Sequence, residues 1–321
     1  MECSFEDMAK VSRAVQSDHP ELFWYNNFEM YEQTGQVNLL YGASVEECEV
    51  LQRRLDEVTP KYLEGIDDSM SAYDVAIRLH VKLINAVDYD TLALQAEEVD
   101  GYPKSDEIDS IRSICGVFLD GRAVCAGYAR AMQYLLHKCG VECAYASGLV
   151  RKENGQSGGG HGWNILKVDG EYYYLDTTWD DSSDTVQTVK NRDFGFDYFC
   201  ITTDELTRTR DLSRCPTDMP PCTAIRANYY YHNGAVMDTY DPELLKTLAQ
   251  KAAQDQQEFF SFKCTSRKLY EEALTKVCTD GKDTFAALKL AAKINKKISP
   301  TYFGYGYNKH IWTITVRFKM K

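Results

Sequence analysis

The chain has 321 residues, 44% of them hydrophobic and 26% charged, which is the balance of a globular protein with more than one small core. Its 36 basic and 48 acidic side chains leave a net charge of −12, which disfavours binding to a nucleic acid or a phospholipid surface. No stretch approaches the roughly 18 consecutive apolar residues of a membrane span, and the opening MECSFEDMAK lacks the features of a secretory signal. We therefore expect no nucleic-acid partner, no membrane span and a cytoplasmic location, with a secreted or cell-surface location left open if the chain has been trimmed.

Residues 1–114 are predicted to form a mainly helical N-terminal portion. Apolar residues recur at helical spacing in three segments, and a turn around Gly35 separates two short segments typical of strands. The predicted helices are Phe5–Val15, Val45–Tyr62 and Ser71–Ala86, and the predicted hairpin strands are Phe28–Tyr31 and Val37–Tyr41.

Residues 115–219 are predicted to form a core in the middle of the chain. Val124–Cys139 carries apolar or small residues on one helical face and is followed by Gly140, a common helix stop. A polar stretch, Arg151–Gly160, separates the first two of three predicted strands. Their alternation and aromatic content favour an antiparallel sheet. These strands are Glu142–Val150, Trp163–Val168 and Glu171–Asp176.

The pair Pro220-Pro221 marks the predicted start of a small α+β domain over residues 220–321. Strand and helix patterns alternate along this part of the chain. The predicted strands are Asn228–His232, Phe259–Lys263, Tyr302–Tyr307 and Trp312–Phe318, and the predicted helices are Pro242–Gln254, Ser266–Cys278 and Thr284–Asn295.

Eleven cysteines are spread thinly over the chain, without the density of a disulfide scaffold or the C-x-x-C pairs typical of zinc sites. We expect most of them to be buried small hydrophobic residues, and we expect no metal and no cofactor. Asp180, Asp181 and Asp184 are a weak calcium candidate, but their spacing fits no EF-hand, so a solvated acidic loop is the favoured interpretation.

Cys125 differs from the other cysteines because it stands in the first turn of the predicted helix. Unpaired N–H groups and the helix dipole favour a thiolate there, and the same N–H groups could stabilise an oxyanion. Gly121 and Gly127 would let a substrate backbone come close. Taken alone, a buried structural cysteine remains the simpler interpretation of Cys125.

His161 and Asp176 are predicted to lie together at one end of a hairpin. If Asp169-Gly170 is a two-residue loop, Asp176 is diagonal to the strand partner of His161 and on the same face of the sheet. A three-residue loop would place the two side chains on opposite faces. The carboxylate would orient the imidazole, and the imidazole would take the thiol proton.

Three local sequences resemble the core motifs of the bacterial transglutaminase-like superfamily. They are GRAVCAGYA from residue 121, HGWN from residue 161 and DTTWDD from residue 176. The resemblance covers residues 115–182, is looser over the first 100 residues and is weak beyond 220. It implies a nucleophile at Cys125, a general base at His161 and an orienting carboxylate at Asp176.

The fold class expected from these observations is α+β. It comprises a transglutaminase-like (papain-like) core with an antiparallel sheet packed on the nucleophile helix, a helical N-terminal portion and a small C-terminal α+β domain. The expected enzyme performs thiol-dependent acyl transfer on an amide or peptide bond of a peptide or protein substrate. Hydrolysis is the first expected reaction. Transamidation is the alternative reaction, and a binding module that keeps the fold without turnover is the alternative of another class.

Four further residues are candidates for the substrate site. Trp163 and Trp179 flank the predicted His–Asp pair and are expected to wall the site and limit water. Gly127 follows the nucleophile, and Gly160 belongs to a Ser-Gly-Gly-Gly segment that either borders the site or forms a plain surface loop. The sequence leaves the oligomeric state open.

Overall fold

The computed structural model describes residues 4–31, 33–93, 95, 108–181, 195–213, 215 and 219–321. The chain divides into two compact units, Met1–Ala224 and Ile225–Lys321. Both units combine helices and strands, so the α+β class is confirmed. Within the part of the chain that the structure describes, no helix has the length and apolar character needed to cross a membrane.

The first unit begins with capped helices and a hairpin, close to the predicted positions. Serine side chains accept from the backbone at the start of each helix, which satisfies N–H groups that have no partner within the helix. The helices are α1 (Phe5–Asp18), α2 (Val45–Leu63) and α3 (Ala72–Ala86), and the antiparallel hairpin strands are β1 (Tyr25–Tyr31) and β2 (Gln36–Tyr41).

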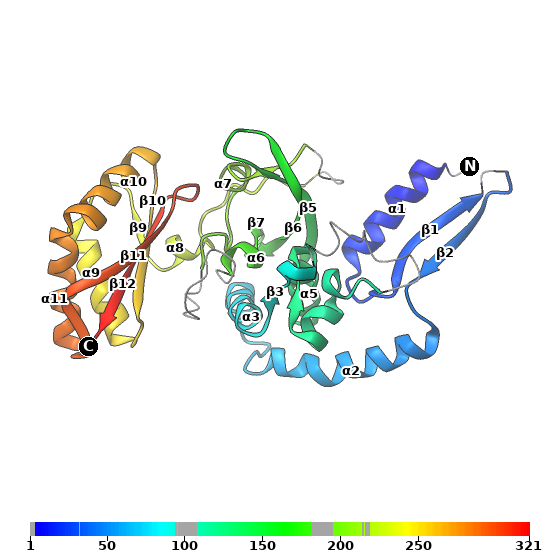
Figure 1. The fold of residues 1–321 in the computed structure, drawn as a ribbon, viewed down its shortest axis with the longest axis horizontal. Coiled ribbons are helices and arrows are strands. Elements are labelled where there is room, and N and C mark those ends of the chain that lie inside the picture. The colour runs from blue at the N-terminus through cyan, green and yellow to red at the C-terminus, as the bar shows by residue number, and fades with distance from the viewer. Residues whose placement is uncertain are drawn as a thin grey trace. The chain divides into compact units, whose positions relative to one another are not determined.

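The core of the first unit is a helix packed on an antiparallel sheet (Figure 1). Helix α5 (Cys125–Lys138) buries Tyr128, Met132 and Leu135 completely. Burying such side chains stabilises the fold by about 1.5–3 kcal/mol each. The sheet order is β7-β6-β5-β8, with β5 (Cys143–Arg151), β6 (Ser157–Val168), β7 (Glu171–Leu175) and β8 (Arg210–Asp211).

Shorter elements join the core. A two-stranded parallel pair immediately precedes α5, and a short helix follows β7. They are β3 (Asp88–Tyr89), β4 (Arg122–Ala123), the 3₁₀-helix Ser110–Arg112, the π-helix Gly116–Asp120, α6 (Thr177–Asp180) and α7 (Thr203–Thr207).

The hairpin between β6 and β7 has the predicted two-residue loop. Val168 pairs with Glu171, and Asp169 and Gly170 both adopt positive φ, at 52° and 84°. Two successive residues of this conformation form the turn that matches the right-handed twist of the strands. The loop therefore fixes which face of the sheet each later side chain occupies.

The prediction that β6 begins near His161 was wrong. The strand starts at Ser157, which pairs with Arg151, so His161 lies inside a long strand. Glycines favour loops in a sequence-based assignment, but here Gly158 packs against Val150 on the neighbouring strand. Backbone pairing with the full length of β5 outweighs that local preference.

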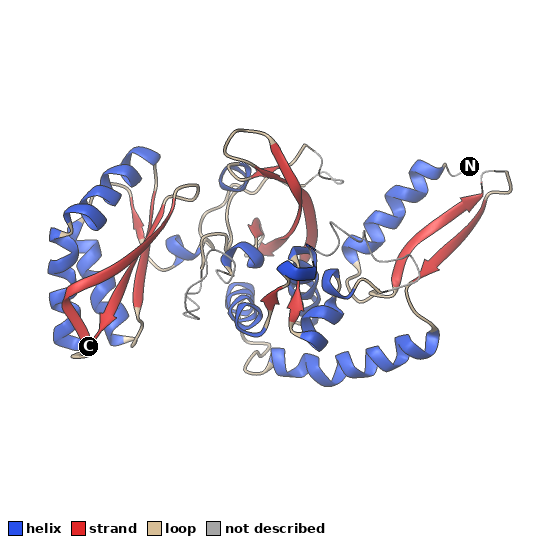
Figure 2. Cartoon of the chain, in the orientation of Figure 1, coloured by secondary structure: helices blue, strands red, loops and turns tan. Residues whose placement is uncertain are grey.

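The second unit has a four-stranded sheet in the order β11-β12-β10-β9. Helices α9 and α11 cover one face of it (Figure 2). Leu245, Phe262, Leu288 and Ile314 are fully buried between the layers. The strands are β9 (Val236–Met237), β10 (Phe259–Cys264), β11 (Ile298–Asn308) and β12 (Thr313–Met320). The helices are α8 (Tyr229–His232), α9 (Pro242–Gln254), α10 (Arg267–Leu274), which continues as the π-helix Thr275–Asp280, and α11 (Lys282–Ile294).

The strand predicted at Asn228–His232 is wrong, because this segment forms the helical turn α8. The side chain of Asn228 accepts a hydrogen bond from the backbone N–H of Tyr230 and caps the turn. The three consecutive tyrosines favour a strand by propensity, but this local capping bond and burial of Tyr230 decide the conformation.

Candidate active site

Cys125 is the first residue of α5 and is partly buried. The parallel pair of β3 and β4 and a hydrogen bond from Val124 N to Ile111 O (2.9 Å) hold the chain just before it. Val124 occupies the N-cap position and offers no side-chain acceptor to the first turn of the helix. The sulfur therefore stands at the positive end of a helix dipole that no side chain caps.

His161, on β6, and the backbone N–H of Gly162 both act on the Cys125 sulfur and favour its ionised form. Burial by itself raises the pKa of Cys125, but the charge and hydrogen bond of His161 and the Gly162 N–H outweigh it, so the pKa is lowered. Burial without such partners instead raises the pKa of Cys115 to about 11 and that of Cys222 to about 12. Cys125 is thus electrostatically distinct from these cysteines.

Asp176, at the end of β7, contacts the His161 ring. Its Oδ2 lies 2.8 Å from Nε2 of His161, and its Oδ1 accepts from the backbone N–H of Trp179 at 3.2 Å. Burial lowers the pKa of His161, but the charges of Asp176 and Cys125 offset this and raise it to about 9. Burial likewise opposes ionisation of Asp176, yet His161 and Arg210 lower its pKa to about 2. His161 and Asp176 therefore lie in contact, as the hairpin register predicts, and Cys125 interacts with His161.

The rings of Trp163 and Trp179, the two tryptophans predicted to flank the site, both lie close to that of His161. Their ring centroids are 6.0 and 5.9 Å from that of the imidazole. Trp163 is fully buried against Gly148, where an added Cβ would lie 2.8 Å from the indole, and Trp179 is partly buried.

Arg210 is a member of the site that the sequence analysis did not identify. It lies on β8, is fully buried, and forms an ion pair with Asp176 through the same Oδ2 that His161 contacts. Its guanidinium lies 3.5 Å from the ring centroid of Trp179. No motif marks this arginine, because it reaches the site through the pairing of a two-residue strand with β5.

Gly127 and Gly160 occupy different environments. Gly127 is buried, and a Cβ added there would lie 2.6 Å from Ile111 O and 2.7 Å from the Cβ of Ala123. The absence of a side chain at Gly127 thus serves packing of α5 against the preceding segment. Gly160 is exposed, and an added Cβ would have no neighbour within 4 Å among the described residues.

We expect Gly127→Ala to lower the free energy of unfolding by about 1–3 kcal/mol, because backbone atoms must move to admit the new methyl group. Gly160→Ala is the matched control, with negative φ and open space around it, and should leave stability unchanged. Urea unfolding of both variants measures the difference. Equal stability of the two would contradict the packing role of Gly127.

The aspartates considered for calcium act as internal acceptors where the structure describes them. Asp180 is buried, pairs with His80 of α3 at 3.4 Å and accepts from Tyr198 N, and burial raises its pKa to about 6. Asp181 accepts from the hydroxyl of Tyr128 at 2.7 Å. Asp184 lies outside the described residues. Within those residues no cluster of three or more His, Cys, Asp or Glu side chains is arranged to hold a metal.

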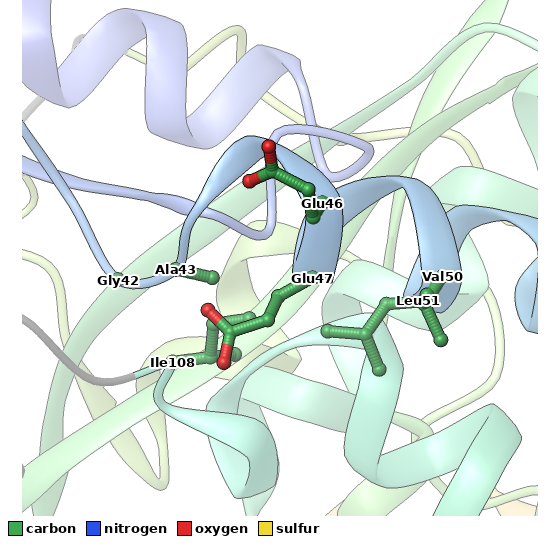
Figure 3. Close-up of a pocket in the computed structure, with 7 residues that line it drawn as sticks. All are labelled: Gly42, Ala43, Glu46, Glu47, Val50, Leu51 and Ile108. Atoms are coloured by element: carbon green, nitrogen blue, oxygen red, sulfur yellow. The ribbon is translucent and has the colours of Figure 1, made fainter.

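A cavity of about 600 Å³ lies at the start of α2 (Figure 3). Carboxylates and apolar side chains line it together, and Cys125, His161 and Asp176 are not among them. The lining residues are Gly42, Ala43, Glu46, Glu47, Val50, Leu51 and Ile108. One of the two carboxylates, that of Glu47, already accepts from the backbone N–H and the hydroxyl of Ser44 in the capping box of α2.

Comparison with solved structures found partial likenesses. One is the crystal structure of a TGase, at 14% identity and a TM-score of 0.34, covering 46% of this chain and 36% of that chain. A second is a proposed cysteine protease from Cytophaga hutchinsonii, at 15% identity and a TM-score of 0.28, covering 39% and 37%. A third is a proposed protease from Parabacteroides distasonis, at 15% identity and a TM-score of 0.27, covering 39% and 25%. The chain thus spans well under half the length of these structures.

A comparison with curated proteins gave no match. Residues 60–177 match the family model of the transglutaminase-like superfamily. The matched range includes α5, both strands of the His161 hairpin and Asp176. Residues 60–177 of this chain therefore resemble the transglutaminase-like superfamily, and this segment carries Cys125, His161 and Asp176.

Proposed function

We propose that the protein catalyses acyl transfer from an amide or peptide bond through a thioester on Cys125. The observation that carries this proposal is a sulfur at a helix N-terminus whose pKa is lowered by an imidazole that a buried carboxylate holds. The thiolate is the nucleophile of cysteine chemistry, and its formation at neutral pH requires such a partner. The match of residues 60–177 to the transglutaminase-like family supports the same reaction class.

In the acylation step, the Cys125 thiolate attacks the carbonyl carbon of the amide and forms a carbon–sulfur bond. The carbonyl electron pair moves onto oxygen and returns as the carbon–nitrogen bond breaks. The imidazolium of His161 gives its proton to the departing nitrogen, so an amine leaves and a thioester with neutral His161 remains. Asp176 stabilises the imidazolium and fixes its orientation throughout.

In the deacylation step, neutral His161 takes a proton from the acyl acceptor while the acceptor attacks the thioester carbon. The carbon–sulfur bond breaks, and the thiolate–imidazolium pair is restored. Backbone N–H groups at the start of α5 are the proposed donors to the oxyanion in both steps. Water as acceptor gives hydrolysis, which is our first choice, and an amine as acceptor gives transamidation.

A panel of peptides, incubated with and without a primary amine and followed by mass spectrometry, tests this function. We expect cleaved or deamidated peptide without the amine, and an adduct with the amine if transamidation competes. Cys125→Ala should abolish both products, whereas Cys139→Ala, at the other end of α5 and with a pKa that burial raises, should retain them. Equal turnover by the Cys125→Ala variant would overturn the proposal, and a lack of turnover by wild type would favour a binding module instead.

A further inference from the structure

We propose that Arg210 is a positioning residue that shares the Asp176 carboxylate with His161 and thereby limits how firmly the carboxylate holds the imidazolium. This inference rests on the proposed function, because it concerns the proton that His161 exchanges during acyl transfer. It assigns a role in the reaction to a residue outside the three expected from the sequence.

The contact geometry is the first support. Nε2 of His161 and Nη2 of Arg210 both bond Oδ2 of Asp176, and Oδ1 is occupied by the backbone N–H of Trp179. One carboxylate oxygen therefore serves two cationic groups. Since the negative charge is divided between them, each cation is held less firmly than it would be alone.

The surroundings of Arg210 are the second support. Its side chain is fully buried, and its guanidinium lies 3.5 Å from the ring centroid of Trp179, 5.5 Å from that of Tyr198 and 5.9 Å from that of Trp163. Backbone pairing of Val150 with Arg210 fixes the strand that carries it. A guanidinium in this position cannot exchange the carboxylate for water, so its charge acts on Asp176 permanently.

The balance of charges gives the reason for such an arrangement. The titratable groups facing the cluster are Cys125 from α5, His161 from β6, Asp176 after β7, Tyr145 from β5, whose ionisation Cys125 opposes, and the hydroxyl-bearing ring of Tyr198. His80 and Asp180 are nearby in the fold but pair with each other. With Arg210 present, the thiolate, imidazolium, carboxylate and guanidinium sum to zero charge. Without it, the buried group carries one negative charge while His161 is protonated and two once His161 loses its proton, so loss of that proton becomes less favourable.

Removing the guanidinium should therefore make His161 harder to deprotonate. This direction distinguishes the proposal from a purely structural role. If Arg210 only kept the site folded, its loss would displace Asp176, and His161 would lose its proton at a lower pH than in wild type. If the charge of Arg210 opposes that of His161, the proton is lost at a higher pH.

The test is the rate of Cys125 alkylation by iodoacetamide as a function of pH, with the Cys125 peptide followed by mass spectrometry. The lower inflection of this profile reports thiolate formation, and the upper inflection reports loss of the His161 proton. In Arg210→Met we expect the upper inflection to move up by roughly half a pH unit or more. Arg210→Lys keeps a positive charge and should return the inflection toward the wild-type value.

Two further variants make the experiment decisive. Arg210→Gln keeps a hydrogen-bond donor without the charge, and we expect it to behave like Arg210→Met; it also carries the test if Arg210→Met does not fold. Arg208→Met removes a neighbouring arginine whose partner, Asp204, is exposed, and should leave the profile unchanged. An upper inflection that stays in place or moves down in both uncharged variants overturns this inference alone. A wild-type profile without a low-pH thiolate overturns the proposed function itself.

Discussion

Replacing Asp176 by alanine is expected to lower the free energy of unfolding by about 3–5 kcal/mol, because it leaves the fully buried Arg210 without its ion-pair partner. The same change removes the acceptor for His161 and for the backbone N–H of Trp179. Denaturant unfolding near neutral pH measures the loss. Asp211→Ala, which removes the partly exposed carboxylate next to Arg210 on β8, is the matched control and should lower stability far less than Asp176→Ala.

Because Asp176 is ionised in the folded protein, we expect the protein to lose stability at low pH. The pKa of Asp176 falls from an ordinary 3.8 to about 2 on folding, so its contribution is complete above about pH 4 and is lost as the pH falls toward 2. Asp176→Asn should lack this part of the acid dependence. An Asp176→Ala protein as stable as wild type would show that the Arg210–Asp176 pair does not form as described.

Replacing His161 by alanine should slow the alkylation of Cys125 at neutral pH by roughly a hundredfold. Burial would then raise the pKa of the sulfur without the opposing charge and hydrogen bond of the imidazole, so little thiolate would remain. Iodoacetamide labelling followed at the Cys125 peptide measures the rate. His137→Ala, near the end of α5 where the ring bonds Cys143 O, is the control and should label at the wild-type rate. A His161→Ala protein that labels as fast as wild type would mean that the helix terminus alone sustains the thiolate.

The parts of the site that the sequence revealed are those set by local rules. Asp169-Gly170 favours a two-residue turn, and that turn sets the strand register in which His161 and Asp176 meet. The helix that begins at Cys125 can be predicted because apolar residues recur at helical spacing along it. The α+β class likewise follows from these periodicities.

The parts that the sequence missed depend on contacts between distant segments. Arg210 lies 34 residues beyond Asp176 and on a strand of only two residues, too short to leave a periodic signal. The early start of β6 depends on backbone pairing with β5. The sequence shows that Gly127 is a small residue. It does not show that Gly127 packs against Ile111 O, because that contact depends on where a segment more than a dozen residues earlier lies in the fold.

The proposed function requires that Cys125 and His161 exist near neutrality as a thiolate and an imidazolium. Nitrogen NMR of histidine-labelled protein measures the imidazole directly. At about pH 7.5 we expect both ring nitrogens of His161 to be protonated in wild type, and the ring to lose its proton at a lower pH in Cys125→Ser. A neutral His161 ring in wild type at that pH, unaltered by Cys125→Ser, would contradict the account.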